Sequence, residues 1–164
     1  LYCPVADLNG LAESILDIGL SEGLKLVGLG ARDSLRLEAG YPLYGHEIDD
    51  TISPLQAGLS WTVKWNKDDF VGREALLSQR DRGVDSEIIH FLLDGRRIAR
   101  EKETVFSQGK PVGRVVSGGF SPMLNRPMGS ALIKVGAALA ELYVDLRGNH
   151  IPLEVKKPPL HKLS

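Results

Sequence analysis

An arginine lies on the apolar side of a predicted helix, and this placement is the first sign of chemistry in the sequence. At about 100° per residue, a helix over residues 29–39 puts Arg32 at the edge of an apolar stripe formed by Ala31, Leu35 and Ala39. A guanidinium beside apolar side chains is stable only when a carboxylate, a carbonyl or an anionic ligand accepts its hydrogen bonds. Arg32 is therefore a candidate for anion binding, unless its side chain reaches past the helix into water.

The loop after this helix adds two phenols to the same region. Gly40 suits a left-handed helix end, and Tyr41 and Tyr44 follow in a loop that contains proline and glycine. Rings with polar tips beside an inward arginine suit a flat, polar, anionic ligand, although two loop tyrosines can equally cap a core. A dinucleotide site is not supported, because Asp33 stands where the glycine fingerprint requires its third glycine.

The remaining reactive residues show no spacing typical of a catalytic or metal centre. The 4 histidines are scattered through the sequence, so a metal site has no support. Cys3 has no obvious base, and no serine lies in a Gly-x-Ser-x-Gly turn. We therefore expect neither a metal ion nor a covalent nucleophile. His46, in the loop after Tyr44, is the histidine nearest to the candidate region.

Several short motifs in this region follow one another in a known order and spacing. They are Ala-Arg-Asp, Leu-Arg-Leu-Glu-Ala-Gly, Leu-Tyr-Gly, Ile-Ser-Pro and Phe-Val-Gly-Arg-Glu-Ala-Leu, at residues 31–33, 35–40, 43–45, 52–54 and 70–76. The series resembles the T-protein of the glycine cleavage system, a tetrahydrofolate-dependent aminomethyltransferase, and the resemblance continues more loosely to the C-terminus. It implies an α+β fold: the C-terminal part of a folate-binding aminomethyltransferase domain, followed by a small antiparallel β-barrel.

The resemblance also implies roles for individual residues. Arg32 would contact the substrate or the folate in a central cavity, and Glu38, Tyr44 and Glu47 occupy motif positions of the same site. Many family members have a ligand-contacting arginine in the C-terminal tail, where this sequence offers Lys162. No catalytic residue is expected in this chain, because the aspartate held essential for activating the folate belongs to an earlier part of the family's sequence.

The implied reaction has two partners besides this chain. The lipoyl-bearing H-protein presents an aminomethyl group, ammonia leaves, and the one-carbon unit passes to tetrahydrofolate. The sequence starts at Leu1, in what looks like a strand, and the family's aspartate and a glutamate before that strand are not in it. We therefore expect the chain to be inactive alone. The implied location is the cytoplasm, or the mitochondrial matrix in a eukaryote.

Three other functions remain open. The folate-binding protein of iron–sulfur cluster assembly shares the fold, but its Lys-Gly-Cys-Tyr-x-Gly-Gln-Glu signature is replaced here by Pro-Leu-Tyr-Gly-His-Glu at residues 42–47. The folate half of a dimethylglycine or sarcosine dehydrogenase would be joined to a flavin domain. A non-catalytic binding module would keep the fold and use the cavity or the barrel surface for a partner.

The composition limits the classes of partner. With 20 basic and 21 acidic residues and a net charge of −1, the sequence has no electrostatic footprint for nucleic acid or an anionic membrane. Its 43% hydrophobic content supports a buried core. The single cysteine excludes an internal disulfide framework and fits a reducing compartment. No apolar stretch approaches the length that crosses a bilayer.

Hydrophobic periodicity predicts mainly helices in the first half of the sequence. Asp7 can N-cap an amphipathic helix, and Trp61 and Trp65 alternate with polar residues as in a strand. A polar break then separates domain 1–83 from domain 84–164. The predicted elements are helices over residues 8–18 and 72–80, a short strand or buried approach over 24–27, and a strand over 59–65.

Beyond about residue 85 the hydrophobic period changes to two, which is typical of strands. Gln108-Gly109 predicts a hairpin turn, and Ser-Gly-Gly-Phe-Ser-Pro at residues 117–122 reads as a flexible turn that shapes a loop facing the folate domain. Short strands between turns predict a small closed barrel or a sandwich. The expected strands cover residues 88–93, 104–106, 112–116, 131–133, 142–146 and 151–155.

Overall fold

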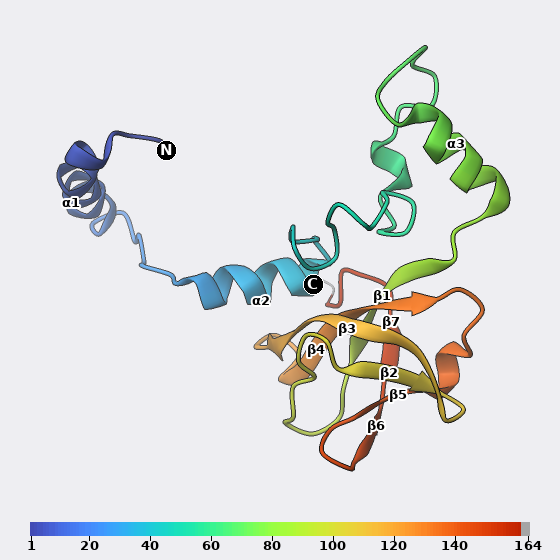
Figure 1. Ribbon diagram of the computed structural model, residues 1–164. Coiled ribbons are helices and arrows are strands. Elements are labelled where there is room, and N and C mark those ends of the chain that lie inside the picture. The colour runs from blue at the N-terminus through green and yellow to red at the C-terminus, as the bar shows by residue number, and fades with distance from the viewer. Residues whose placement is uncertain (162–164) are drawn as a thin grey trace. The chain divides into compact units, whose positions relative to one another are not determined.

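The computed structural model describes residues 1–161, and the chain divides into two compact units, Leu1–Arg32 and Asp33 onward (Figure 1). The first unit is helical. A 3-10 turn, η1 (Val5–Asp7), leads into α1 (Leu8–Gly19), and the unit ends within α2 (Leu29–Ala39). Asp7 occupies the N-cap position of α1 but makes no capping hydrogen bond through its side chain. The amphipathic helix predicted over residues 8–18 is confirmed.

The strand predicted at Leu1 is wrong, and so is the strand or buried approach predicted over residues 24–27. Residues 1–4 and 24–28 have no regular secondary structure, and the side chains of Leu26 and Val27 are 81% and 78% exposed. A strand needs a neighbouring strand to take up its backbone hydrogen bonds. Within the described residues neither segment has such a neighbour, so their apolar character alone does not produce extended pairing.

In the second unit, a 3-10 helix replaces the strand predicted over residues 59–65. This helix, η2 (Ser60–Thr62), is closed by local hydrogen bonds: the amide and the hydroxyl of Thr62 donate to the Leu59 carbonyl at 2.9 and 2.8 Å. Because these bonds satisfy the backbone locally, the alternation of tryptophans does not produce a buried face, and Trp61 is 75% exposed. The helix predicted over residues 72–80 is confirmed as α3 (Arg73–Arg82).

Seven antiparallel strands form one sheet in the order β6-β5-β2-β3-β4-β1-β7 (Figure 1). The two end strands, β6 and β7, are separated in sequence only by Leu153. Because β6 pairs with β5 and β7 pairs with β1, the two ends of the sheet are brought close together and the sheet curls around its core. In the described chain the end strands do not pair with each other. The predicted α+β class with a small antiparallel barrel is confirmed. The strands are β1 (Ser86–Leu92), β2 (Thr104–Ser107), β3 (Lys110–Ser121), β4 (Arg126–Lys134), β5 (Leu142–Asp145), β6 (His150–Pro152) and β7 (Glu154–Lys156), with a 3-10 turn, η3 (Leu139–Glu141), before β5.

The predicted hairpin at Gln108-Gly109 is confirmed between β2 and β3. Both turn residues have positive φ angles, 51° and 76°, as a tight two-residue turn of this kind requires. Inside the curled sheet, apolar side chains from all of the long strands meet in one core. The core includes Phe91, Leu93, Val105, Val115, Ala131, Ile133, Leu142 and Val144, each 1% exposed or less.

The Ser-Gly-Gly-Phe-Ser-Pro stretch was predicted as a turn, and this is wrong, because its first five residues lie in β3. Gly118 pairs with Gly129 across the β3–β4 ladder. A Cβ atom at Gly118 would overlap the carbonyl oxygen of Ala99, and one at Gly129 would lie 2.5 Å from the Phe91 ring. The glycines therefore allow close packing on the strand and do not reverse the chain.

This packing predicts different costs for two adjacent glycines. Gly118→Ala should lower the free energy of unfolding by about 2 kcal/mol or more, because the added methyl meets a backbone carbonyl that cannot move alone. Gly119→Ala is the matched control, since its Cβ would only touch Leu37 Cδ2 at 3.6 Å. Urea denaturation followed by circular dichroism would measure both. Equal losses in the two variants would contradict the close-packing explanation.

Candidate functional site

The second half of α2 buries three consecutive residues, Arg36, Leu37 and Glu38. Leu37 packs with Leu92, Met128 and Leu160 in a small apolar cluster. Leu35 is 64% exposed, so the apolar stripe predicted to face inward is wrong, and the helix buries a charged face instead. Burying two charged side chains is costly unless every donor and acceptor finds a partner.

Arg36 uses its guanidinium to join three parts of the chain. Its Nη1 donates to both carboxylate oxygens of Glu47 at 2.9 and 2.8 Å, and its Nε donates to Asp33 Oδ1 at 2.8 Å. Its Nη2 donates to the hydroxyl of Ser117 on β3 at 3.0 Å. The fork therefore fixes the helix to the following loop and to the barrel. Such an arrangement needs the planar, multi-donor geometry of arginine.

Glu47, which is 2% exposed, is the acceptor at the centre of this network. Besides Arg36, it accepts hydrogen bonds from the Leu43 amide at 2.9 Å and from the Ser130 hydroxyl on β4 at 2.5 Å. Burial is the largest single influence and favours the neutral acid. The hydroxyls of Ser130 and Ser117, the Leu43 amide and the Arg36 charge together outweigh it, so the pKa of Glu47 is lowered and the group is a carboxylate at neutral pH.

Glu38 forms a second buried anchor on the same helix. It is 1% exposed, and its Oε1 accepts from the Ser121 hydroxyl at 2.5 Å and from the Met123 amide at 3.3 Å. Its backbone carbonyl accepts from the Leu160 amide at 2.7 Å. Glu38 therefore holds the end of β3 through its side chain and the C-terminal segment through its backbone.

His90 lies beside the ion pair without a hydrogen bond of its own at Nδ1. It stands on β1, opposite Ser130 of β4 and Lys156 of β7, and its Nδ1 atom is buried. Burial lowers the pKa of His90; the nearby Glu47 charge raises it and the Arg36 charge lowers it, and the net direction is down. The imidazole is therefore neutral at pH 7, which avoids a second positive charge next to Arg36.

The remaining loop residues are more exposed. Tyr44 is 66% exposed, and its hydroxyl donates to Asp50 Oδ1 at 2.7 Å, a hydrogen bond that raises the pKa of the phenol. His46 Nδ1 lies 2.9 Å from the carbonyl oxygen of Val116, which fixes it as the protonated nitrogen. The loop after α2 is thus tied to β3 at a point next to Ser117.

The residues predicted as ligand contacts fall into different environments. Glu38 and Glu47 are buried and engaged by protein donors, whereas Arg32 and Tyr44 are exposed. Lys162 lies outside the described residues. Within the described residues Arg32 forms no ion pair or hydrogen bond through its side chain, so its guanidinium is available to an anion, and its contact with a ligand stays a prediction.

Sequence reasoning did not find the partners that complete the network. Ser117, Ser121 and Ser130 lie 81 to 83 residues from the side chains they contact, and isolated serines in apolar strands carry no signal of such contacts. The sequence predicted no role for Arg36. Its spacing of three residues from Asp33 was the one local sign that it would be paired.

Two further features of the described residues bear on metal binding and membranes. The described residues contain no group of three or more histidine, cysteine, aspartate or glutamate side chains that could hold a metal ion. None of the helices in that part of the chain combines the length and the apolar character that a membrane crossing requires.

The curled antiparallel sheet with its anchored helix and loop defines an α+β protein with a C-terminal barrel. Comparison with known families agrees: residues 1–67 match the GCVT N-terminal domain, and residues 87–162 match the glycine cleavage T-protein C-terminal barrel domain. The chain belongs to the glycine cleavage T-protein family. The two matched ranges lie on either side of the predicted domain boundary at residues 83 and 84, which stays a prediction.

Individual relatives cover nearly the whole chain. It is 40% identical over 164 residues to an aminomethyltransferase of Desulforamulus reducens, covering 99% of this chain and 45% of that protein. It is 41% identical over 160 residues to a probable aminomethyltransferase of Pyrococcus horikoshii, covering 91% of this chain and 40% of that protein. The crystal structure of glycine cleavage system aminomethyltransferase T from Bartonella henselae superposes with a TM-score of 0.85 at 32% identity, over 96% of this chain and 45% of that one. The chain therefore spans less than half the length of these relatives.

The buried carboxylate predicts how the protein responds to acid. Because the pKa of Glu47 is lower in the folded state than its ordinary value of 4.5, its stabilisation is present above pH 4.5 and is lost as the pH falls through the folded value. Glu47→Gln should cost about 3 kcal/mol at pH 7, because Arg36 loses its main counter-charge. The variant should also lose less stability on acidification. Urea titrations at several pH values would measure this, with exposed Glu141→Gln as the control; an unchanged pH profile in Glu47→Gln would contradict the prediction.

His90 predicts a second, milder pH dependence. Its lowered folded pKa means that the neutral ring stabilises the native state above the ordinary value of 6.5 and that this stabilisation is lost as the pH falls below it. His90→Leu should remove the change in unfolding midpoint between about pH 5 and pH 7, at little cost because Nδ1 makes no hydrogen bond. His150→Leu, an exposed histidine, should keep that change. If His90→Leu retains it, another group is responsible.

Proposed function

We propose that this chain provides the C-terminal half of an aminomethyltransferase of the glycine cleavage system. The observation that carries the proposal is the match to both T-protein domains in sequence order, together with about 40% identity to aminomethyltransferases along nearly the whole chain. The proposed reaction takes the aminomethyl group from the lipoyl arm of the H-protein, releases ammonia and passes the one-carbon unit to tetrahydrofolate. We also propose that it takes place in the cytoplasm, or in the mitochondrial matrix of a eukaryote.

In this proposal the chain contributes binding and orientation. The nitrogen of tetrahydrofolate supplies the attacking electron pair, so the protein must hold two large substrates in register and does not need a nucleophile of its own. Arg32, exposed and without an ion-pair partner in the described residues, would bind a carboxylate or carbonyl group of the folate or substrate. Tyr44, exposed on the loop that follows α2 in the sequence, would offer an aromatic face to the ligand.

Glu38 and Glu47 would act as positioning residues. Their carboxylates are 1% and 2% exposed and accept hydrogen bonds from serines and backbone amides. They would therefore serve the ligand site by fixing α2 and its loop, without touching the ligand. We propose that the chain alone is inactive and that the rest of a T-protein must supply the group that activates the folate.

A fusion protein would test the proposed function. The part of the Desulforamulus reducens relative that precedes its matched segment would be joined to Leu1 of this chain. We expect the fusion to release ammonia from aminomethyl-lipoyl H-protein in a tetrahydrofolate-dependent manner, and the chain alone to release none. Calorimetric titration with 5-methyltetrahydrofolate would measure binding by the fusion. Arg32→Ala should weaken it by at least about tenfold, or 1.4 kcal/mol.

The exposed Arg82→Ala is the matched control and should bind like the unmodified fusion. A folded fusion that binds no folate would exclude the proposed function. Folate binding that Arg32→Ala leaves unchanged would keep the folate proposal and remove Arg32 from the site. Turnover by the 164-residue chain alone would show that the inactivity proposed for it is wrong.

A further inference from the structure

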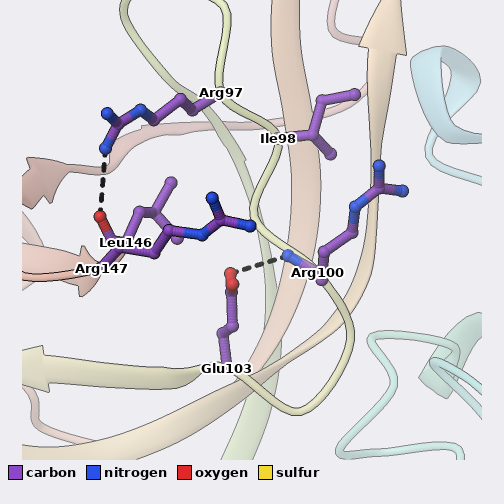
Figure 2. A pocket seen from close by; sticks show the side chains of 6 residues that line it. All are labelled: Arg97, Ile98, Arg100, Glu103, Leu146 and Arg147. Atoms are coloured by element: carbon purple, nitrogen blue, oxygen red, sulfur yellow. Dashed lines mark hydrogen bonds between the residues drawn. The ribbon is translucent and has the colours of Figure 1, made fainter.

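A cavity of about 320 Å³ lies on the barrel, away from the residues of the Arg36 network in sequence. It forms where the connection between β1 and β2 meets the turn that follows β5. Figure 2 shows the six side chains that line it: Arg97, Ile98, Arg100, Glu103, Leu146 and Arg147. Leu146 is 6% exposed and Ile98 is half-buried, so the cavity has an apolar wall beside its charged groups.

Two hydrogen bonds shape this cavity. Arg97 Nη1 donates to the carbonyl oxygen of Leu146 at 3.1 Å, which ties the two segments together. The carboxylate of Glu103 accepts from the Arg100 amide at 2.7 Å, which folds the Arg100–Glu103 loop back on itself. In Figure 2, Arg147 lies between these two contacts. The backbone around the cavity is therefore fixed by the protein before any ligand binds.

The turn that carries Arg147 is fixed as well. Arg147 has a left-handed backbone with a φ of 59°, and the Asp145 carboxylate accepts the Gly148 amide at 2.6 Å. Asp145 is thus engaged with the turn and not with the arginine. The backbone that carries Arg147 is therefore already ordered, and ligand binding has to order only its side chain.

The charge of the cavity is unbalanced. Arg36, Arg80 and Arg126 form ion pairs with carboxylates. In the described part of the chain, Arg97, Arg100 and Arg147 form no ion pair. The Glu103 carboxylate accepts a hydrogen bond from a backbone amide. Three guanidinium groups and one carboxylate leave two positive charges at one cavity. In Figure 2 the Arg147 guanidinium lies between those of Arg97 and Arg100, and an anion bound beside it would offset the excess positive charge.

We propose that this cavity binds a small dianion that carries a diphosphate or two carboxylates. Guanidinium groups bind such anions in pairs of parallel hydrogen bonds. The cavity volume lies in the range of small-molecule sites. The apolar wall of Leu146 and Ile98 would contact the carbon part of a dicarboxylate or of a diphosphate ester. This site goes beyond the proposed aminomethyl transfer and does not depend on it.

Titration of the full 164-residue chain would test the site. The probes are inorganic pyrophosphate and succinate, with sodium chloride at equal ionic strength as the blank, and the readout is the amide NMR resonances. We expect saturable shifts in residues 97–103 and 146–148 with at least one probe. The probe that binds identifies the ligand as a phosphate or a carboxylate.

Amino-acid substitutions distinguish a specific anion-binding site from nonspecific electrostatic attraction of the anion. Arg147→Gln and Arg100→Gln should each weaken binding by at least about fivefold, because each removes charge-assisted hydrogen bonds. Arg96→Gln is the matched control: it removes the same charge from the residue next to Arg97 but does not line the cavity. It should weaken binding by less than about twofold. Amide dispersion of each variant shows whether it is folded.

Three results would overturn the proposal. The first is a folded chain whose amides show no saturable shift with either probe. The second is an Arg96→Gln variant that binds as weakly as Arg147→Gln, which would mean unspecific attraction to a basic surface. The third is a shift that grows linearly with probe concentration and is reproduced by sodium chloride, which would mean an ionic-strength effect and no bound anion.

Discussion

The buried ion pair between Arg36 and Glu47 is the contact on which the arrangement of the second unit depends. Taking both charges out of water costs several kcal/mol per ion, roughly, and only a complete set of hydrogen bonds offsets that cost. Here the set comes from a helix, a loop and two strands: Asp33 and Arg36 on α2, Leu43 in the loop, Ser117 on β3 and Ser130 on β4. Removing any one of them takes at least one hydrogen bond away from a buried charged group.

The two serines receive the ion pair because the strands that carry them are in register. Ser117 and Ser130 are direct neighbours across the β3–β4 ladder, and the next pair along is Gly118 and Gly129. These two glycines let the Ala99 backbone and the Phe91 ring approach β3 and β4 on the barrel. Two neighbouring pairs across the ladder therefore provide both the hydroxyls that satisfy the charges and the space that allows the barrel to pack closely.

Two kinds of element could be predicted from the sequence. One is the helix or hairpin turn with a clear sequence signal, and the other is the strand whose alternate apolar residues face a buried core. The amphipathic α1, the Gln108-Gly109 hairpin and most strands of the barrel belong to these two kinds. The strand predicted over residues 59–65 is wrong because local 3-10 hydrogen bonds satisfy the backbone of this segment. The turn predicted over residues 117–122 is wrong because glycine content does not distinguish a turn from a closely packed strand. The network itself was beyond prediction, since its serines lie more than 80 residues from Arg36 and Glu38 in sequence.

The same contrast explains why the sequence does not assign a role to each residue of the candidate site, whose ligand contacts stay predictions. The motifs from Ala31 to Glu47 contain both exposed groups and buried ones, and residue type does not separate them: Arg32 is exposed and Arg36, one turn later in the same helix, is buried. A buried carboxylate such as Glu47 is as specific in its partners as a ligand contact would be, because unsatisfied charge is equally costly in either place. A recurring motif can therefore encode an anchor as readily as a binding group. What distinguishes the two is whether hydrogen-bond partners from the protein already surround the side chain, as they do for Glu38 and Glu47 and do not, in the described residues, for Arg32.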